Sequence, residues 1–336
     1  MSFKLILGQP RATAQLQAMV SQQNLPAALL FTGLEGCGKF FTALQLAKVI
    51  NCRRSARGEA CNSCADCRQI ERQVHPDVKV VTAEKSQIKI DQVRELQTYL
   101  SYAPLRALVK VVIIDNAHLF NLAAASAMLK ILEEPPDETL FILVTHRPQI
   151  LLPTIISRCL QISFLPLDEV SQVEILQNID EVQASTEILR QVVHFSGGSI
   201  ARCLFFLAEG RLVWRRQLLT RFVAVSAGNL DDIFKLAAEI SQDILLVEAA
   251  YYLFTTFIRD VLLLGTGVRV ENLFHPDLQD LSSAFAKRIS FSRLSAWFDE
   301  LNCLQRDMLS NINIRLVWEA LFLRLAAMLT PADNHG

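Results

Sequence analysis

The sequence carries almost no net charge and has no long hydrophobic run. Its 33 lysines and arginines are balanced by 34 acidic residues, giving a formal net charge of -1. Strong independent binding to nucleic acid is therefore not expected from charge. No stretch reaches about 18 uninterrupted apolar residues, and the best candidate, 245–264, contains Glu248, Arg259 and Asp260. The N-terminal apolar stretch is too short for a signal peptide. We therefore expect a soluble, cytoplasmic protein without a membrane partner.

The length and the hydrophobic content point to a large buried core. A chain of 336 residues suggests two or three domains. Hydrophobic residues make up 51% of the sequence and charged residues only 20%. Such a balance is typical of a protein that buries extra surface against partners, although a large helical core alone would also explain it.

The first half of the sequence alternates between strand and helix signals. Short apolar runs predict strands at 28–31, 78–82, 109–114, 140–144 and 161–164. Helical spacing lies between them at 39–50, 90–101 and 119–134, the last stopped by two prolines. Because the runs do not alternate with polar residues, the strands are expected to be covered on both faces. Strands separated by helices predict a parallel sheet, so residues 1–166 are interpreted as one α/β domain.

Strand signals stop after residue 166. Residues 168–210 contain helical segments broken at Gly197 and Gly198, and 211–330 are almost entirely helical in pattern. The final predicted helix, 314–328, is apolar almost all round. Such a helix should be buried in its own domain or against another subunit.

A phosphate-binding loop is predicted at residues 33–39. The sequence there matches G-x-x-x-x-G-K, with Gly33, Gly36, Gly38 and Lys39 between a predicted strand and a predicted helix. Glycines let successive N–H groups point at phosphate oxygens, and the lysine reaches the terminal phosphates. The alternative is an ordinary glycine-rich turn from strand to helix.

Two departures from this pattern affect hydrolysis. The residue after Lys39 should carry a hydroxyl that holds Mg²⁺, but it is Phe40. A second strand ends in Asp115, which would support the metal, yet the residue that should activate water is Asn116. We expect no efficient Mg²⁺-dependent hydrolysis, while weak binding of ATP or ADP stays open. Alternatively, one of the two departures is a tolerated variant.

Four of the eight cysteines are concentrated in a short segment. Cys52, Cys61, Cys64 and Cys67 have the spacing C-x8-C-x2-C-x2-C. Four sulfurs with no open position are typical of a structural zinc site, and the metal would supply folding free energy to a loop that has no core. An iron–sulfur cluster and unliganded thiols are the alternatives.

These features together resemble the bacterial DNA polymerase III clamp-loader family. Residues 25–31 precede the phosphate loop as they do in that family, and a cysteine module at 52–67 is a mark of its gamma/tau and delta-prime types. Residues 128–136 are close to the family's Leu-Lys-x-Leu-Glu-Glu-Pro-Pro signature. Residues 152–159 contain its Ser-Arg-Cys motif. Phe40 and Asn116 make the chain similar to the non-hydrolysing delta-prime type.

The resemblance implies an AAA+ (RecA-like) P-loop α/β domain at 1–166, a small helical lid domain at 167–210 and a helical collar at 211–330. It implies that Arg158 is an arginine finger acting on a neighbouring ATP site, an effect of about 10³-fold or more. Without the motif, a surface salt bridge is the simpler interpretation of Arg158. Thr145 lies where the family has a polar nucleotide sensor, and Ala201 stands where motor subunits carry a sensing arginine.

The resemblance also implies partners. They are the gamma/tau motor subunits and the delta subunit, the sliding clamp, and primed DNA reached through the assembled complex, within the DNA polymerase III holoenzyme at the replisome. No intrinsic ATPase activity is expected. The alternatives are an active gamma/tau-like ATPase with an atypical Mg²⁺ site, and a DNA-binding protein in which the zinc module reads DNA. His118 is interpreted as part of a helix start rather than as a catalytic base.

Overall fold

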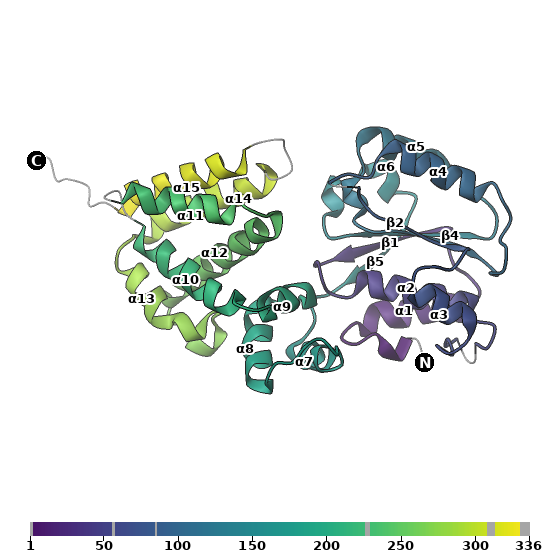
Figure 1. The fold of residues 1–336 in the computed structure, drawn as a ribbon, viewed down its shortest axis with the longest axis horizontal. Coiled ribbons are helices and arrows are strands. Elements are labelled where there is room, and N and C mark those ends of the chain that lie inside the picture. Colours follow the sequence, from purple (N-terminus) through teal and green to yellow (C-terminus); the bar gives the residue numbers. More distant parts are fainter. Residues whose placement is uncertain (1–2, 56–57, 85, 226–228, 308–312, 330–336) are drawn as a thin grey trace, which may run out of the picture. The chain divides into compact units, whose positions relative to one another are not determined.

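The structure is a computed structural model that describes residues 3–55, 58–84, 86–225, 229–307 and 313–329, with side chains omitted at 304–307. The chain forms two compact units, Met1–Cys203 and Leu204–Gly336 (Figure 1). Each unit is described by itself. The predicted division into three domains stays a prediction, and its last boundary, residue 330, lies outside the described residues.

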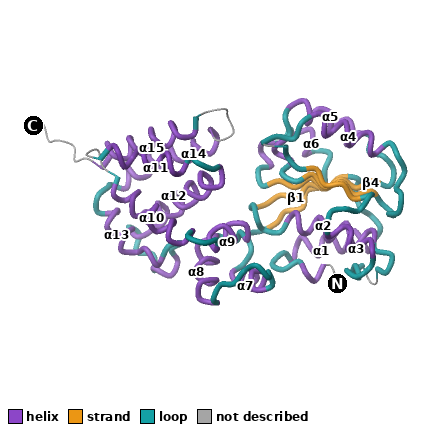
Figure 2. Tube along the Cα trace, viewed as in Figure 1, coloured by secondary structure: helices purple, strands orange, loops and turns teal. Residues whose placement is uncertain are grey.

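A five-stranded parallel sheet forms the centre of the first unit (Figure 2). The strands are β1 (Ala28–Gly33), β2 (Val78–Val81), β3 (Lys110–Ile114), β4 (Thr139–Thr145) and β5 (Leu160–Phe164). Their order is β2-β3-β4-β1-β5, so β2 and β5 are the edges. Each strand predicted from an apolar run is present, and the predicted parallel pairing is confirmed.

Helices cover both faces of this sheet (Figure 1). One layer holds α1 (Pro10–Ser21), α2 (Lys39–Asn51) and α3 (Ala65–Glu71), and the other holds α4 (Ile90–Leu100), α5 (Leu122–Glu133) and α6 (Pro153–Ile156). Successive strand residues alternate between the two layers: Val111 and Ile113 pack toward one, Val112 and Ile114 toward the other. Burial on both faces explains why these strands are continuous apolar runs.

The first unit also contains short 3₁₀ turns and three further helices. The turns are η1 (Phe3–Leu5), η2 (Ala117–Leu119) and η3 (Pro148–Ile150), and the helices are α7 (Glu169–Gln177), α8 (Thr186–Ser196) and α9 (Ile200–Leu207). The predicted break at Gly197 and Gly198 is confirmed, because α8 ends at Ser196 and Gly197 adopts a left-handed φ of 61°.

The predicted helix 119–134 begins later than expected. A 3₁₀ turn precedes it, and α5 starts at Leu122 because the Asn121 side chain caps it by accepting a hydrogen bond from Ala124 N (2.8 Å). Three helices, α1, α3 and α6, were not predicted. The first begins with Pro10, which is favoured at the first helical position because it needs no N–H partner there.

The second unit is helical throughout its described residues. It contains α10 (Arg211–Ala224), α11 (Leu230–Ile240), α12 (Ile244–Leu264), α13 (Gln279–Ala286), α14 (Phe291–Asp307) and α15 (Ile314–Leu329), with η4 (Val270–Asn272) and η5 (Pro276–Leu278). An aromatic cluster forms its core, in which the buried Phe222 ring contacts Phe254, Trp297 and Phe322.

The final helix is buried on one face only. Trp318, Phe322 and Leu325 are inside the unit, whereas Leu316 is 59% and Leu323 37% exposed. Burial within its own domain is therefore confirmed for one face of α15, and burial of the other face against another subunit stays a prediction. No described helix combines the length and the apolar character needed to cross a membrane.

Candidate functional site

The predicted phosphate loop lies at the carboxyl end of β1 and leads into α2. Gly38 adopts a φ of 96° immediately before the helix, and Lys39 is the first helical residue. The strand–loop–helix context that gives the G-x-x-x-x-G-K pattern its meaning is therefore present.

The Lys39 ammonium group is bound by the loop's own backbone. Its Nζ donates hydrogen bonds to the carbonyl oxygens of Gly33 (2.8 Å) and Leu34 (2.5 Å). Only 6% of this residue is exposed, and burial lowers the pKa of its ammonium group. Burial has the opposite effect on the carboxyl group of Asp115, at the end of β3, because it raises the pKa of an acid. To bind a terminal phosphate, Lys39 would first have to give up both carbonyl partners.

The start of α9 packs directly on the phosphate loop. Ile200 N donates to Gly36 O at 2.9 Å. A Cβ at Gly36 would lie 2.6 Å from both Ala201 N and Ser199 Oγ, so no larger residue fits there. Gly36 also has a φ of 72°, which L-residues rarely adopt. Main-chain and van der Waals contacts with the start of α9 thus hold the loop in place at Gly36. Ala201, which makes part of this contact, stands where motor subunits carry a nucleotide-sensing arginine.

The two predicted departures from a hydrolytic site have structural consequences. Phe40 is half-buried and packs against the core beneath α2. The next hydroxyl, that of Thr42, donates to Gly38 O at 2.9 Å and is therefore engaged with the helix backbone. Asn116 donates its backbone N–H and its side-chain amide to the two carboxylate oxygens of Asp115, at 3.0 and 3.3 Å. A metal-binding hydroxyl and a proton-accepting carboxylate are both missing from these two positions.

A histidine pair beside Thr145 was not predicted. His118 Nδ1 lies 3.1 Å from Thr145 Oγ1, and the His118 ring meets the His146 ring edge to face at 4.4 Å. Burial lowers the pKa of His118 to about 3 and that of His146 to about 4, so both are neutral at pH 7. The signal available in the sequence is that each histidine closely follows one of two strands, β3 and β4, that are neighbours in the sheet.

Arg158 lies near the amino ends of the strands, whereas the phosphate loop lies at their carboxyl ends. The register pairs Leu29 with Leu160 and Gly33 with Phe164, so Arg158 comes before the amino end of β5. The loop instead begins at the carboxyl end of β1. Its Nη2 forms an ion pair with Glu133 Oε1 at 2.7 Å, its Nη1 donates to Thr154 O at 2.9 Å, and 34% of the side chain is exposed. The structure does not bring Arg158 to the chain's own loop.

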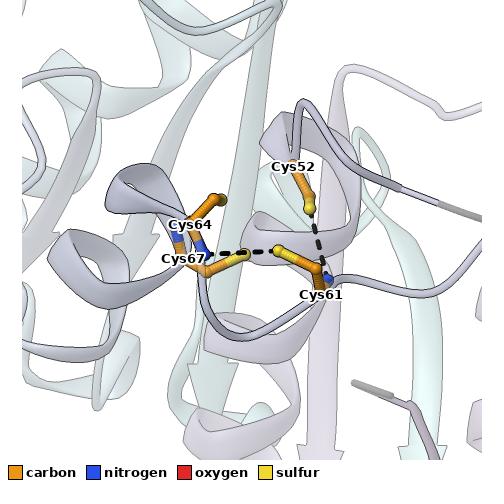
Figure 3. A group of neighbouring side chains, drawn as sticks. All are labelled: Cys52, Cys61, Cys64 and Cys67. Atoms are coloured by element: carbon orange, nitrogen blue, oxygen red, sulfur yellow. Dashed lines mark hydrogen bonds between the residues drawn. The ribbon is translucent and has the colours of Figure 1, made fainter.

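The four clustered cysteines converge on one point (Figure 3). Their Sγ atoms all lie within 4.8 Å of one another. Cys52 caps the end of α2, and Cys64 caps the start of α3. Backbone N–H groups point at the sulfurs: Cys61 N lies 3.3 Å from Cys52 Sγ, and Cys64 N lies 3.3 Å from Cys61 Sγ.

This geometry fits a tetrahedral thiolate site. Metal–sulfur bonds of about 2.3 Å place four sulfurs about 3.8 Å apart, close to the observed grouping. Burial raises the pKa of the Cys52 and Cys67 thiols, whereas hydrogen bonds from Ser63 lower the pKa of Cys61 to about 5. A cation among the four sulfurs would favour the thiolate form of all of them. The cluster can therefore hold a metal ion, as predicted.

Two family models match most of the chain. One, described as DNA polymerase III, delta subunit, matches residues 8–168. The other, described as DNA polymerase III, delta subunit, C terminal, matches residues 209–327.

Curated relatives match over shorter stretches. The tau subunit of DNA polymerase III from Escherichia coli is 32% identical over 234 residues, which is 69% of this chain and 36% of that protein. The delta' subunit from Bacillus subtilis is 40% identical over 159 residues, 47% of this chain and 48% of that protein. The chain thus spans between a third and a half of the length of these relatives. A gamma-subunit-related protein of known structure from Thermotoga maritima has 17% identity and a TM-score of 0.45, covering 94% of this chain and 99% of that one.

A P-loop parallel sheet, a cysteine module and a helical second unit define an AAA+ clamp-loader subunit, which confirms the predicted fold class. The chain belongs to the clamp-loader subunits of DNA polymerase III, of the delta-prime type.

Proposed function

We propose that the chain is a non-hydrolysing stator subunit that lends Arg158 to the ATP site of a neighbouring motor subunit. This proposal rests on the position of Arg158. Its side chain is partly exposed and lies near the amino ends of the strands, at the opposite end from the chain's own phosphate loop. A side chain that precedes the amino end of β5 lies at the opposite end of the strands from the loop and has no role in catalysis there. It is available to a site on another subunit.

The chain's own loop supports the same proposal. Phe40 and Asn116 supply neither a metal-binding hydroxyl nor a proton acceptor, and Lys39 is engaged with backbone carbonyls. Ile200 and Ala201 pack against Gly36 within this loop. We propose that ATP and ADP bind this site weakly or not at all.

An arginine supplied in trans stabilises the charge that develops on a transferred phosphoryl group, by about 10³-fold or more. A guanidinium group has five N–H donors, so Arg158 can keep its ion pair with Glu133 while its remaining donors face that charge. The ion pair in the isolated chain is thus compatible with a finger in the complex.

The proposed partners are the gamma/tau motor subunits and the delta subunit, and the proposed task is loading the sliding clamp onto primed DNA within the cytoplasmic replisome. The three predicted domains, 1–166, 167–210 and 211–330, would then be the P-loop domain, the lid and the collar. Exposed Leu316 and Leu323 on α15 support a collar that packs against other subunits.

We further propose that the cysteine cluster holds a structural zinc ion. Four thiols at C-x8-C-x2-C-x2-C spacing leave no open coordination position, which favours a structural over a catalytic ion. Cys52 and Cys64 lie at the ends of α2 and α3, so the ion would tie the two helices together and order the loop between them.

The decisive experiment is reconstitution with motor subunits in which only the neighbour of this chain keeps an intact phosphate loop. Arg158→Ala should lower clamp- and DNA-stimulated hydrolysis about 100-fold or more while assembly persists. Arg94→Ala, which removes an exposed arginine paired with Asp91, is the matched control. Undiminished hydrolysis by Arg158→Ala would rule out the finger.

The two alternatives have their own tests in the isolated chain. Brisk ATP turnover that is abolished by Lys39→Ala would favour an active gamma/tau-like ATPase. Tight DNA binding that weakens steeply with salt would favour a zinc-module DNA-binding protein.

A further inference from the structure

The outer edge of β2 is open for pairing at Val80. On either side of it, Val78 N already donates to His75 O, and Thr82 O accepts from Gln92 Nε2. β2 is the last strand of the sheet and, within the described residues, pairs only with β3. The carbonyl oxygens of Asp77 and Val81 accept hydrogen bonds from Val111 N and Asp115 N of the β3 segment. Backbone groups alternate between the two sides of a strand, so the N–H and C=O of Val80 point away from β3 toward the open edge.

A hollow of about 440 Å³ lies beside this edge. Its lining includes Val74, Pro76, Val78, Lys79, Val80 and Tyr99. The volume lies within the range of about 300–1,000 Å³ typical of ligand-binding sites. The hollow therefore offers space along main-chain groups that have no strand partner.

The two sides of the hollow differ in chemistry. Val78 and Val80 share one face of β2, and Val74, which is 66% exposed, adds apolar surface to the lining. The opposite face of the strand carries the exposed Lys79. Tyr99 of α4 also lines the hollow, and its hydroxyl has no hydrogen-bond partner within the described part of the chain. An occupant would thus meet apolar groups on one side and the exposed Lys79 ammonium group on the other.

We propose that the β2 edge binds an extended peptide segment of a partner protein by strand addition. Main-chain hydrogen bonds to Val80 provide affinity, and alternate side chains of the peptide provide specificity. Because side chains of an added strand alternate, the peptide carries apolar residues toward Val74 and Val80 and acidic residues toward Lys79. This site shares no residue with the phosphate loop, Arg158 or the cysteine cluster, so it is independent of the function proposed above.

Lys79 has a second consequence for the choice of partner. A charged lysine on an edge strand disfavours chance pairing with another sheet edge, because its ammonium group would be buried without a counter-charge. An acidic residue opposite it removes that penalty. The edge should therefore discriminate for acidic extended segments and against neutral or basic ones.

The test is selection of random dodecapeptides displayed on phage against the full chain, with the Val80→Pro chain as counter-target. Proline removes the outward N–H of Val80 and leaves the pairing with β3 in place. Enriched peptides should alternate apolar and acidic residues. A fluorescein-labelled copy should bind the wild-type chain saturably in fluorescence anisotropy and protect the Val80 amide from hydrogen exchange.

Matched variants separate main-chain from side-chain contributions. Val80→Pro should weaken peptide binding about tenfold or more. Val80→Ala keeps the N–H and should weaken binding by less than about threefold. Lys79→Glu should weaken binding about tenfold. Methylating the peptide's own pairing N–H groups should abolish binding, and this arm needs no change to the protein. Enrichment of no alternating sequence, or equal affinity of the Val80→Pro and wild-type chains, would overturn the proposal.

Discussion

The Arg158 guanidinium lies 2.7 Å from the Glu133 carboxylate, joining the end of α5 to the segment that follows α6. The two residues belong to two separate sequence motifs, at 128–136 and 152–159, which the fold brings together. A second hydrogen bond, from Arg158 Nη1 to Thr154 O, fixes the other side of the guanidinium group. The arginine is therefore held in place by its own subunit before any partner arrives.

Replacing Glu133 by glutamine should weaken this positioning without unfolding the chain. We expect Glu133→Gln to change the free energy of unfolding by less than about 1 kcal/mol, because both side chains are partly exposed. In the reconstituted complex, stimulated ATP hydrolysis should fall about three- to tenfold, since a less well-placed guanidinium stabilises the transition state less. Urea unfolding and steady-state hydrolysis measure the two effects.

Asp91→Asn is the matched control, because it breaks the exposed Arg94–Asp91 pair, which shares no residue with either motif. It should leave stimulated hydrolysis unchanged. A hydrolysis rate for Glu133→Gln equal to that of the wild type would show that the ion pair has no part in positioning Arg158.

The three central strands, β1, β3 and β4, were predictable because they are buried on both faces. Runs such as Val111 to Ile114 are apolar at every position, so neither periodicity nor exposure obscures them. Helix α1 was missed because its sequence, PRATAQLQAMVS, mixes polar with apolar residues, and only Ala12 and Leu16 are buried. The start of α5 was predicted too early because Leu119 continues the apolar pattern of the helix. Leu119 belongs instead to the 3₁₀ turn η2.

The candidate sites were likewise predictable only where they depend on a local sequence pattern. The cysteine cluster and the phosphate loop are local patterns, so spacing alone located them. The packing of Ala201 on Gly36 and the contact of His118 with His146 join segments far apart in the chain. Such contacts depend on strand order and on the path of the chain after β5, which no local pattern specifies.

The close approach at Gly36 predicts a specific loss of stability. Alanine there must adopt a φ of 72°, at a cost of about 1–2 kcal/mol, and its methyl group would overlap Ala201 N. Relieving that overlap adds about 1–3 kcal/mol. Gly58→Ala is the matched control, because Gly58 has a φ of 75° and open space around it. In urea unfolding, equal losses for the two variants would contradict the close packing of Ala201.

Removal of one cysteine should release the proposed metal. The wild-type chain should contain about one zinc ion, and Cys64→Ser should lose most of it, because three thiolates leave the tetrahedral site incomplete. Its melting temperature should fall by several degrees and become insensitive to chelators. Cys303→Ser, which alters an exposed cysteine in the second unit, should keep its zinc. Elemental analysis that finds iron, or no metal, in the wild-type chain would refute the zinc assignment.

Asp77 should make stability depend on pH in the acidic range. Burial alone would raise the pKa of this carboxyl, but hydrogen bonds from Leu105 N, Arg106 N and Ala107 N, at 2.8–2.9 Å, outweigh it and lower the pKa. Because the folded pKa lies below the unfolded one, the carboxylate stabilises the fold fully above about pH 4. That stabilisation is lost as the pH falls through the lowered folded pKa.

Asp77→Asn should therefore cost about 2 kcal/mol at pH 7 and progressively less below pH of about 4. Urea unfolding of the variant and of Asp91→Asn across this range measures the effect, and a constant difference between wild type and Asp77→Asn at all pH values would contradict it.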